Sequence, residues 1–164
     1  MKTVFIIVGD MGSANELIQA ADELIALGAR VYWFADTRGK AVQMLVNRQV
    51  LHELRGPNPD DAPDAILVGT SATAVGLQIA WTRYGQEKHI PVVWLEDLWG
   101  TGEREATRCV APDTMLTVDE TAAEIARAVR PNVRTVVVGK PSFEYLGKLA
   151  PQTPHVFRGD LRKI

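Results

Sequence analysis

The chain has 164 residues, 46% of them hydrophobic, which is enough for one well-formed core and too short for two full domains. Its 18 basic and 20 acidic residues give a net charge of -2, which excludes the large basic face that binds nucleic acid or anionic membranes. Cys109 is the single cysteine, so an internal disulfide framework and a cysteine-cluster metal site are excluded as well.

The chain begins with a strand, a turn and a helix. Residues 3–8 form a continuous apolar run, which is typical of a parallel strand buried on both faces. A glycine-containing turn over 9–12 ends this run. Residues 13–16 match a capping box, and apolar side chains at helical spacing continue to Gly28, a residue that favours a helix end. Residues 30–35 then form a second strand, which a right-handed crossover joins to the first.

The rest of the chain repeats this alternation. Helical spacing over 39–48 precedes a segment, 50–54, that is consistent with a short third strand. The loop 56–63 contains three prolines, which can continue neither a helix nor a strand. The later strands are expected over residues 64–68, 90–95, 114–118 and 134–138, and the later helices over 71–84 and 119–129.

This order of elements predicts an α/β fold: a Rossmann-like, doubly wound and mostly parallel sheet of about six or seven strands, with helices on both faces. We expect this domain to span residues 1–150. Residues 151–164 contain two prolines and a charged end, and we expect a linker or the start of a missing second domain there. The first apolar run is too short for a signal peptide or a transmembrane helix, so we expect a cytoplasmic location.

Functional groups are expected on the loops that leave the carboxyl ends of the strands, because open α/β sheets bind their ligands there. Asp10 and Asp97 are the candidate catalytic residues. Asp10 is either a general base toward a hydroxyl or a solvated turn residue. The candidate ligand-binding residues are Gly9, Met11, Gly12, Ser13, Thr70, Ser71, Glu96, Trp99 and Lys140.

Several of these residues have a structural interpretation beside the functional one. Gly9 and Gly12 let backbone amides approach an anion or only shape the turn, since neither the dinucleotide fingerprint nor a P-loop is complete. Thr70 and Ser71 suit a phosphate or a sugar hydroxyl, or cap the following helix. Ser71 lacks the frame of a hydrolase nucleophile, and the three histidines show neither triad order nor metal-ligand spacing.

The last group of candidates follows the later strands. Glu96 and Asp97 are neighbours at a strand end, so their side chains are expected on opposite faces, and only one of them can easily face a cleft. Trp99 either stacks on a ring of the ligand or packs under its loop. Lys140 is placed to neutralise a phosphate. The sequence leaves these alternatives open.

Four segments carry a resemblance to a known group of proteins. They are residues 64–71 (DAILVGTS), residues 90–97 (IPVVWLED), Pro112-Asp113 before Val118-Asp119, and residues 138–144 (VGKPSFE). With the glycine turn after the first strand, they make residues 1–147 resemble the N-terminal half of glycosyltransferase-B-fold proteins, including relatives of the non-hydrolysing UDP-N-acetylglucosamine 2-epimerases. The epimerase-type His-Glu-Ala-Gly segment is replaced here by residues 95–99, a departure from epimerase chemistry.

The resemblance implies that the first-strand loop faces the acceptor, which puts Asp10 in acceptor binding or base catalysis. It also implies that a nucleotide-sugar donor binds mainly in a second Rossmann domain. We therefore expect an acceptor-side N-terminal domain of a glycosyltransferase-B-like, nucleotide-sugar-dependent enzyme. Such a domain would be inactive alone and would need a second, donor-binding domain or subunit.

Two other hypotheses come from the residues themselves. One is a stand-alone, non-catalytic module that binds a sugar, a nucleotide or a partner protein, with Leu98, Trp99 and the apolar positions around Trp81 as candidate docking residues. The other uses Asp10, Asp36 and Asp97 to hold Mg²⁺, which prefers oxygen ligands. Neither a resident cofactor or metal nor a nucleic-acid partner is expected, and the sequence leaves a homodimer open.

Overall fold

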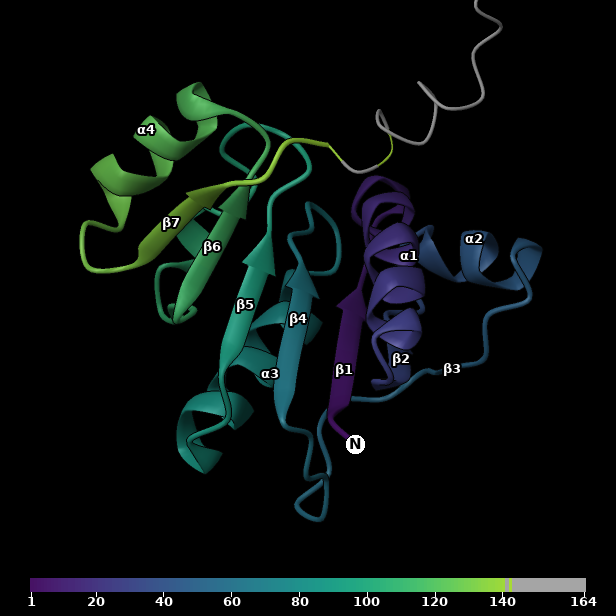
Figure 1. The fold of residues 1–164 in the computed structure, drawn as a ribbon. Helices are drawn as coiled ribbons and strands as arrows, with labels where there is room; N and C mark the ends of the chain where they lie inside the picture. The colour runs from purple at the N-terminus through teal and green to yellow at the C-terminus, as the bar shows by residue number, and fades with distance from the viewer. Residues whose placement is uncertain (141, 143–164) are drawn as a thin grey trace, which may run out of the picture.

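The computed structural model describes residues 1–140 and 142. The strands are β1 (Thr3–Val8), β2 (Arg30–Ala35), β3 (His52–Glu53), β4 (Ala65–Gly69), β5 (Val92–Leu95), β6 (Thr114–Thr117) and β7 (Arg134–Val137). The helices are α1 (Met11–Ala26), α2 (Ala41–Asn47), α3 (Val75–Lys88), the 3-10 turn η1 (Glu105–Thr107) and α4 (Glu120–Val129). The seven strands form one sheet in the order β3-β2-β1-β4-β5-β6-β7, and every neighbouring pair is parallel (Figure 1).

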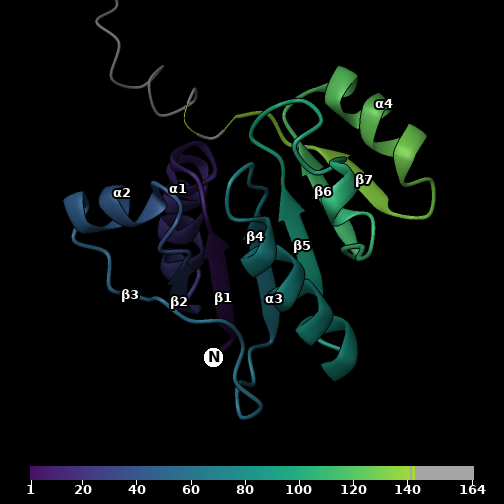
Figure 2. The ribbon, with the colours of Figure 1, turned by 180° about the vertical axis from the view of Figure 1, so that it is seen from behind.

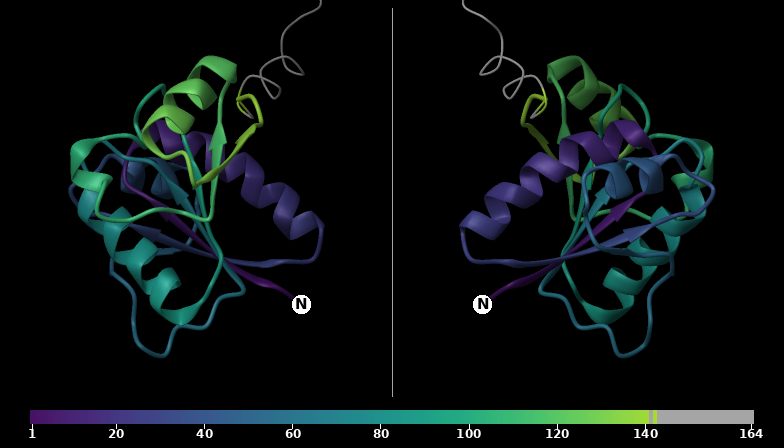
Figure 3. Two further views of the ribbon diagram at one scale, coloured as in Figure 1. Left: turned by 90° about the vertical axis from the view of Figure 1, so that its left-hand side faces the viewer. Right: turned by 90° about the vertical axis from the view of Figure 1, so that its right-hand side faces the viewer.

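Helices cover both faces of the sheet, which Figures 1 and 2 show from opposite sides and Figure 3 from the edges. Alternate side chains of β1 point to opposite faces. Ile6 belongs to one buried cluster with Leu17 of α1, whereas Ile7 belongs to another with Trp81 of α3. The first cluster also holds residues of α2, and the second also holds a residue of α4. The predicted doubly wound α/β fold is confirmed, with a sheet that is parallel throughout the described part.

The strand order reverses beside β1. From β1 the chain moves outward to β2 and β3, returns to β4 on the other side of β1, and then moves outward again to β7. The loop that leaves β1 leads to α1 on one face, and the loop that leaves β4 leads to α3 on the other. A reversal of this kind is where open α/β sheets form a ligand crevice.

The start of α1 differs from the sequence prediction. The helix begins at Met11, and its N-cap residue, Asp10, makes no side-chain cap hydrogen bond. The predicted capping box is therefore wrong. Ser13 Oγ donates to the Asp10 carbonyl at 3.2 Å, and the Glu16 carboxylate accepts hydrogen bonds from Ser142 rather than from the helix start.

The start of α3 differs too. It begins at Val75, with Ala74 as N-cap, so neither Thr70 nor Ser71 caps it as the sequence suggested. Ser71 Oγ instead accepts the amide hydrogens of Thr73 at 3.2 Å and Ala74 at 2.8 Å. This hydroxyl closes the turn that precedes the helix.

Other local predictions agree with the structure. Gly28 ends the first helix with a φ of 86°, a left-handed value that glycine adopts at little cost. Residues 141 and 143–164 lie outside the described part of the chain, so the linker predicted over 151–164 stays a prediction. No helix of the described residues is both long and apolar enough to cross a membrane.

Candidate functional site

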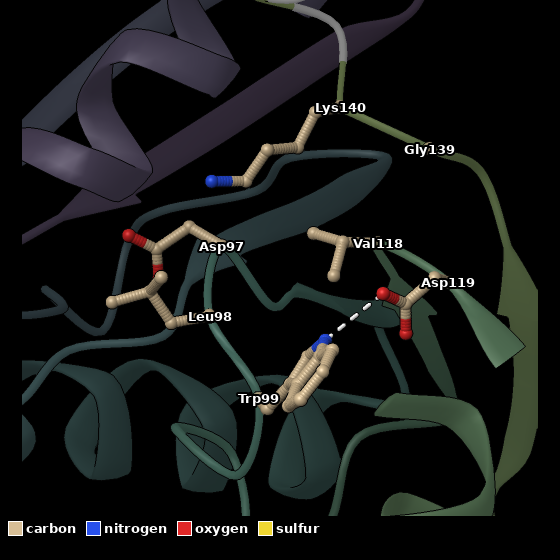
Figure 4. A pocket seen from close by; sticks show the side chains of 7 residues that line it. All are labelled: Asp97, Leu98, Trp99, Val118, Asp119, Gly139 and Lys140. Atoms are coloured by element: carbon tan, nitrogen blue, oxygen red, sulfur yellow. Dashed lines mark hydrogen bonds between the residues drawn. The ribbon is translucent and has the colours of Figure 1, made fainter. Parts of the chain in front are cut away.

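A pocket of about 640 Å³ opens at the carboxyl ends of β5, β6 and β7. Its volume is within the range of small-molecule sites. We call it the Trp99 pocket, and its lining residues are Asp97, Leu98, Trp99, Val118, Asp119, Gly139 and Lys140 (Figure 4). Three of the predicted site residues are thus brought together from two strand ends, since Asp97 and Trp99 follow β5 and Lys140 follows β7.

Asp97 is the most enclosed charged group that lines this pocket. It is the second residue after β5, and its side chain is 7% exposed. It reaches the first turn of α1, because a Cβ atom added to Gly12 would overlap Asp97 Oδ2. Burial raises the pKa of the Asp97 carboxyl, and the negative charges of Asp10 and Glu16 raise it further, while the Asp97 amide and the Lys140 ammonium oppose the rise. Asp97 is therefore a stronger base than an exposed aspartate.

Glu96 lies on the other face of the sheet, as the alternation along a strand predicts. Its side chain is fully buried, and Oε1 accepts a hydrogen bond from the Gly102 amide at 3.2 Å. Burial raises the pKa of Glu96 to about 7, and the nearby Glu103 carboxylate adds to the rise. Glu103 in turn pairs with Arg130, at 3.3 Å between Oε2 and Nε. Glu96 therefore supports the loop that carries Trp99 and does not line the pocket.

Trp99 stands on the rim of the pocket. Its side chain is 58% exposed, and Nε1 donates to Asp119 Oδ2 at 3.0 Å. Asp119 is itself fixed, since Oδ1 accepts the Ala122 amide hydrogen at 2.9 Å as the N-cap of α4. The indole is thus oriented by a helix cap and remains open to a ligand.

Asp119 and Val118 were not singled out as site residues from the sequence. Their place between a predicted strand and a predicted helix was visible, but nothing indicated that this strand end meets Trp99. Lys140 lies across the pocket from Trp99 in Figure 4. Its ammonium lowers the pKa of Asp97 by charge attraction. A left-handed turn at Gly139, with a φ of 77°, precedes it.

Asp10 lies at the reversal of strand order rather than among the pocket-lining residues. Its carboxylate accepts hydrogen bonds from the Ala72 amide at 2.6 Å and from Thr73 Oγ1. Burial alone would raise the pKa of Asp10, but these two bonds and the Ser71 hydroxyl hold it below its usual value. Asp10 therefore ties the loop after β1 to the loop after β4 and stays ionised.

The glycine of the first loop permits close packing at this junction. A Cβ atom on Gly9 would overlap the side chains of Ser71 and Ala74, and one on Gly39 would overlap the Gly9 carbonyl. The loops after β1 and β2 consequently pack backbone against backbone, and the loop after β4 packs the small side chains of Ser71 and Ala74 against Gly9. This close packing supports the turn-shaping interpretation of Gly9, while anion binding by its loop stays a prediction.

The remaining predicted site residues are distributed around this junction. Ser13, Thr70 and Ser71 are buried, and Thr70 Oγ1 lies 2.7 Å from Thr101 Oγ1 in a hydrogen bond. Met11 is exposed at the first turn of α1. The sequence therefore selected residues that form two adjoining groups, a packed junction beside β1 and an open pocket beside β5 to β7.

The magnesium hypothesis finds no support in this arrangement. The Asp36 carboxylate is held by Arg38, with Nη2 at 2.8 Å from Oδ2, at the end of β2. That hydrogen bond is the main cause of the lowered pKa of Asp36. Among residues 1–140 and 142, no group of three or more His, Cys, Asp or Glu side chains is placed to hold a metal ion.

Comparison with solved structures identifies similar folds. MurG from Acinetobacter baumannii is 15% identical, with a TM-score of 0.62 over 85% of this chain and 45% of that chain. The UDP-N-acetylglucosamine 2-epimerase from Rickettsia bellii is 17% identical, with a TM-score of 0.64 over 91% of this chain and 47% of that chain. No protein-family model matches the sequence, and a search of curated proteins found no match either.

These structures have the glycosyltransferase-B fold, so the resemblance noted in the sequence is confirmed at the level of the fold. The chain spans less than half the length of both proteins. It therefore has the Rossmann-like architecture of one domain of such a protein.

Proposed function

We propose that this chain is the acceptor-side domain of a glycosyltransferase-B-like, nucleotide-sugar-dependent enzyme. Residues 1–150 would form the domain, and residues 151–164 would lead toward a donor-binding domain or subunit. The observation that carries the proposal is the position of Asp97, a nearly buried carboxyl with a raised pKa that opens into a pocket at the carboxyl edge of the sheet.

Asp97 is the proposed general base. A base removes a proton best when its pKa lies near the working pH, and burial moves Asp97 in that direction. An acceptor hydroxyl bound in the Trp99 pocket would pass its proton to the Asp97 carboxylate as its oxygen attacks the anomeric carbon of the donor sugar. The nucleoside diphosphate leaves with the electron pair of the broken glycosidic bond.

Asp10 has a supporting part in this proposal. Its lowered pKa keeps it charged, and that charge raises the pKa of Asp97 across the N-terminal turn of α1. Lys140 acts in the opposite sense, because its positive charge favours the ionised form of Asp97 that accepts the proton. Burial is the main cause of the raised pKa of Asp97, and the charges of these two groups adjust it in opposite directions.

The test begins with the intact mass of the protein as its native cell makes it, followed by isolation of any partner that copurifies. The natural protein, with its second domain or partner, should transfer sugar from a UDP-, GDP- or dTDP-sugar. Residues 1–164 alone should not. Asp97→Asn should abolish transfer while the folded state persists. If the complete assembly transfers sugar from none of these donors, the proposal is wrong.

A stand-alone binding module is the second candidate, and the exposed apolar rim of the pocket favours it. Leu98 and Trp99 are both more than half exposed. If the rim docks a protein or a second copy of the chain, Leu98→Asp should dissociate the complex in size-exclusion chromatography with light scattering. Unchanged association would remove the protein-docking version.

A further inference from the structure

The charge around the Trp99 pocket is unfavourable for phosphate. Two carboxylates, Asp97 and Asp119, line it against the single ammonium of Lys140. Two more carboxylates stand behind Asp97, since the charges of Asp10 and Glu16 both raise its pKa. Lys140 already interacts with another group of the protein. A phosphate or diphosphate entering here would meet more negative than positive charge.

The apolar part of the pocket is centred on one aromatic ring. Trp99 is 58% exposed, whereas the other three tryptophans, Trp33, Trp81 and Trp94, are at most 6% exposed. Leu98 and Val118 flank the indole (Figure 4). An open ring of this kind offers a flat apolar surface to a ligand that also has a flat apolar face.

The polar groups complete the description of the ligand. Asp119 is held by Trp99 Nε1 and by the Ala122 amide, and each of its oxygens keeps a further lone pair. Asp97 lies on the adjoining wall of the pocket in Figure 4. Ionised carboxylates only accept hydrogen bonds, so a ligand that fits these groups carries hydrogen-bond donors, such as hydroxyls, around an apolar ring face.

We infer that the Trp99 pocket binds an uncharged pyranoside, with its C–H face on the Trp99 ring and its hydroxyls on Asp97 and Asp119, and that it disfavours phosphate-bearing ligands. The inference rests on the proposed function, for which this sugar would be the acceptor. The anionic donor then has to be bound elsewhere, on the second domain or subunit.

The test uses the fact that Trp99 is the exposed tryptophan. Acrylamide quenching of tryptophan fluorescence should report mainly on this residue, and a bound sugar should reduce the quenching. The probes are methyl glycosides of glucose, N-acetylglucosamine, galactose, mannose and rhamnose at millimolar concentrations. UMP, inorganic phosphate and glucose 6-phosphate are tested in parallel, and saturation-transfer NMR gives a second measure of binding.

At least one methyl glycoside should protect Trp99. Trp99→Phe should retain this binding, since a ring remains, and Trp99→Ala should lose it. Glucose 6-phosphate should bind about tenfold more weakly than methyl glucoside, a difference of about 1.4 kcal/mol. Asp97→Asn should reduce that discrimination. Leu51→Ala is the matched control, because the Leu51 side chain is apolar, 92% exposed and remote from the pocket. This variant should leave glycoside binding unchanged.

Three outcomes would overturn the inference: no glycoside of the panel binds, binding survives Trp99→Ala, or a phosphate-bearing probe binds as tightly as its neutral counterpart. Circular dichroism of each variant separates lost binding from lost folding. Sugar transfer to a phosphate-bearing acceptor through Asp97 would leave the proposed function standing and refute the neutral acceptor. Glycoside binding without any sugar transfer by the complete assembly would leave the neutral sugar site standing and refute the proposed function.

Discussion

Glu16 on α1 accepts two hydrogen bonds from Ser142, a residue 126 positions later in the chain. The Ser142 amide lies 2.8 Å from Oε2 and the Ser142 hydroxyl 2.5 Å from Oε1, and both residues are buried. After β7, at the edge of the sheet, the chain runs over the carboxyl ends of the strands toward α1 (Figure 1). This contact fastens it there and places Lys140, two residues earlier, over the Trp99 pocket.

Replacing Glu16 should weaken the fold through this contact. Glu16→Gln turns two hydrogen bonds to a carboxylate into neutral ones, because the amide oxygen can accept the Ser142 amide hydrogen and the amide NH2 group can donate to the Ser142 hydroxyl. We expect a loss of about 1–3 kcal/mol in the free energy of unfolding by urea. Ser142→Ala removes only the hydroxyl and should cost less. The exposed Glu23 of the same helix is the control, and Glu23→Gln should stay within about 0.5 kcal/mol of the wild type. Additive effects in the Glu16–Ser142 double variant would contradict a direct interaction.

The buried Glu96 should make stability fall as pH rises. Its folded pKa, about 7, is above its ordinary value of 4.5, so the native state favours the protonated carboxyl. The stabilisation is complete below pH 4.5 and is lost as pH rises through about 7, with an upper limit of roughly 3 kcal/mol. Urea unfolding at several pH values would measure this decline.

Glu96→Gln should remove that decline and leave the protein more stable than the wild type above neutral pH. The amide oxygen can still accept the Gly102 hydrogen bond. The lowered pKa values of Asp10, Asp36 and Asp61 act with the opposite sign at lower pH, so the informative quantity is the difference between variant and wild type. If the difference in unfolding free energy between Glu96→Gln and the wild type is the same at pH 5 and at pH 8, Glu96 titrates normally.

Gly12→Ala should damage the pocket more than the fold. The added methyl group would overlap Asp97 Oδ2, so the carboxylate must move. Alanine is a better helix former than glycine by about 1 kcal/mol, which offsets part of the strain. Glycoside binding should fall while the urea midpoint changes little. Gly28→Ala is the comparison, because its φ of 86° makes it destabilising at a site remote from the pocket. If Gly12→Ala binds glycosides as tightly as the wild type, the close contact between Gly12 and Asp97 is disproved.

Asp10→Asn should lower the pKa of Asp97, since it removes a negative charge that raises it. Carboxyl-carbon NMR titration would measure the change. The variant should also lose stability at neutral pH, where the ionised Asp10 accepts hydrogen bonds from Ala72 and Thr73. Asp36→Asn, whose carboxylate pairs with Arg38, is the control and should leave the pKa of Asp97 unchanged. An unmoved Asp97 titration in the Asp10 variant would exclude the proposed coupling.

Much of this architecture follows from local pattern. The apolar run 3–8 has side chains for both faces of a sheet, so it predicts a buried parallel strand, and the structure has one there. Gly28 and Asp119 mark a helix end and a helix start through backbone and capping preferences that act within a few residues. Such signals depend on neighbours in sequence and can be recognised in one dimension.

The capping-box prediction failed because the deciding contact is not with a neighbour in sequence. The Glu16 pattern was correct in spacing, but its carboxylate binds Ser142, whose distance along the chain no local rule can anticipate. Likewise, Ser71 has the chemistry of a helix cap, and its hydroxyl instead closes the preceding turn, where the loops after β1 and β4 meet. In both cases a tertiary contact competes with the local one.

The sequence by itself determined the order of strands and helices, the doubly wound class and the strand ends on which functional groups lie. Alternation along β5 also determined that Glu96 and Asp97 point apart. Only the tertiary structure decided that Asp97 faces α1 and the pocket, that Glu96 is buried under the Trp99 loop, and that Asp119 orients the indole. The physical reason is that periodicity fixes the relative direction of neighbouring side chains, whereas burial, charge and pKa depend on which distant segments pack around them.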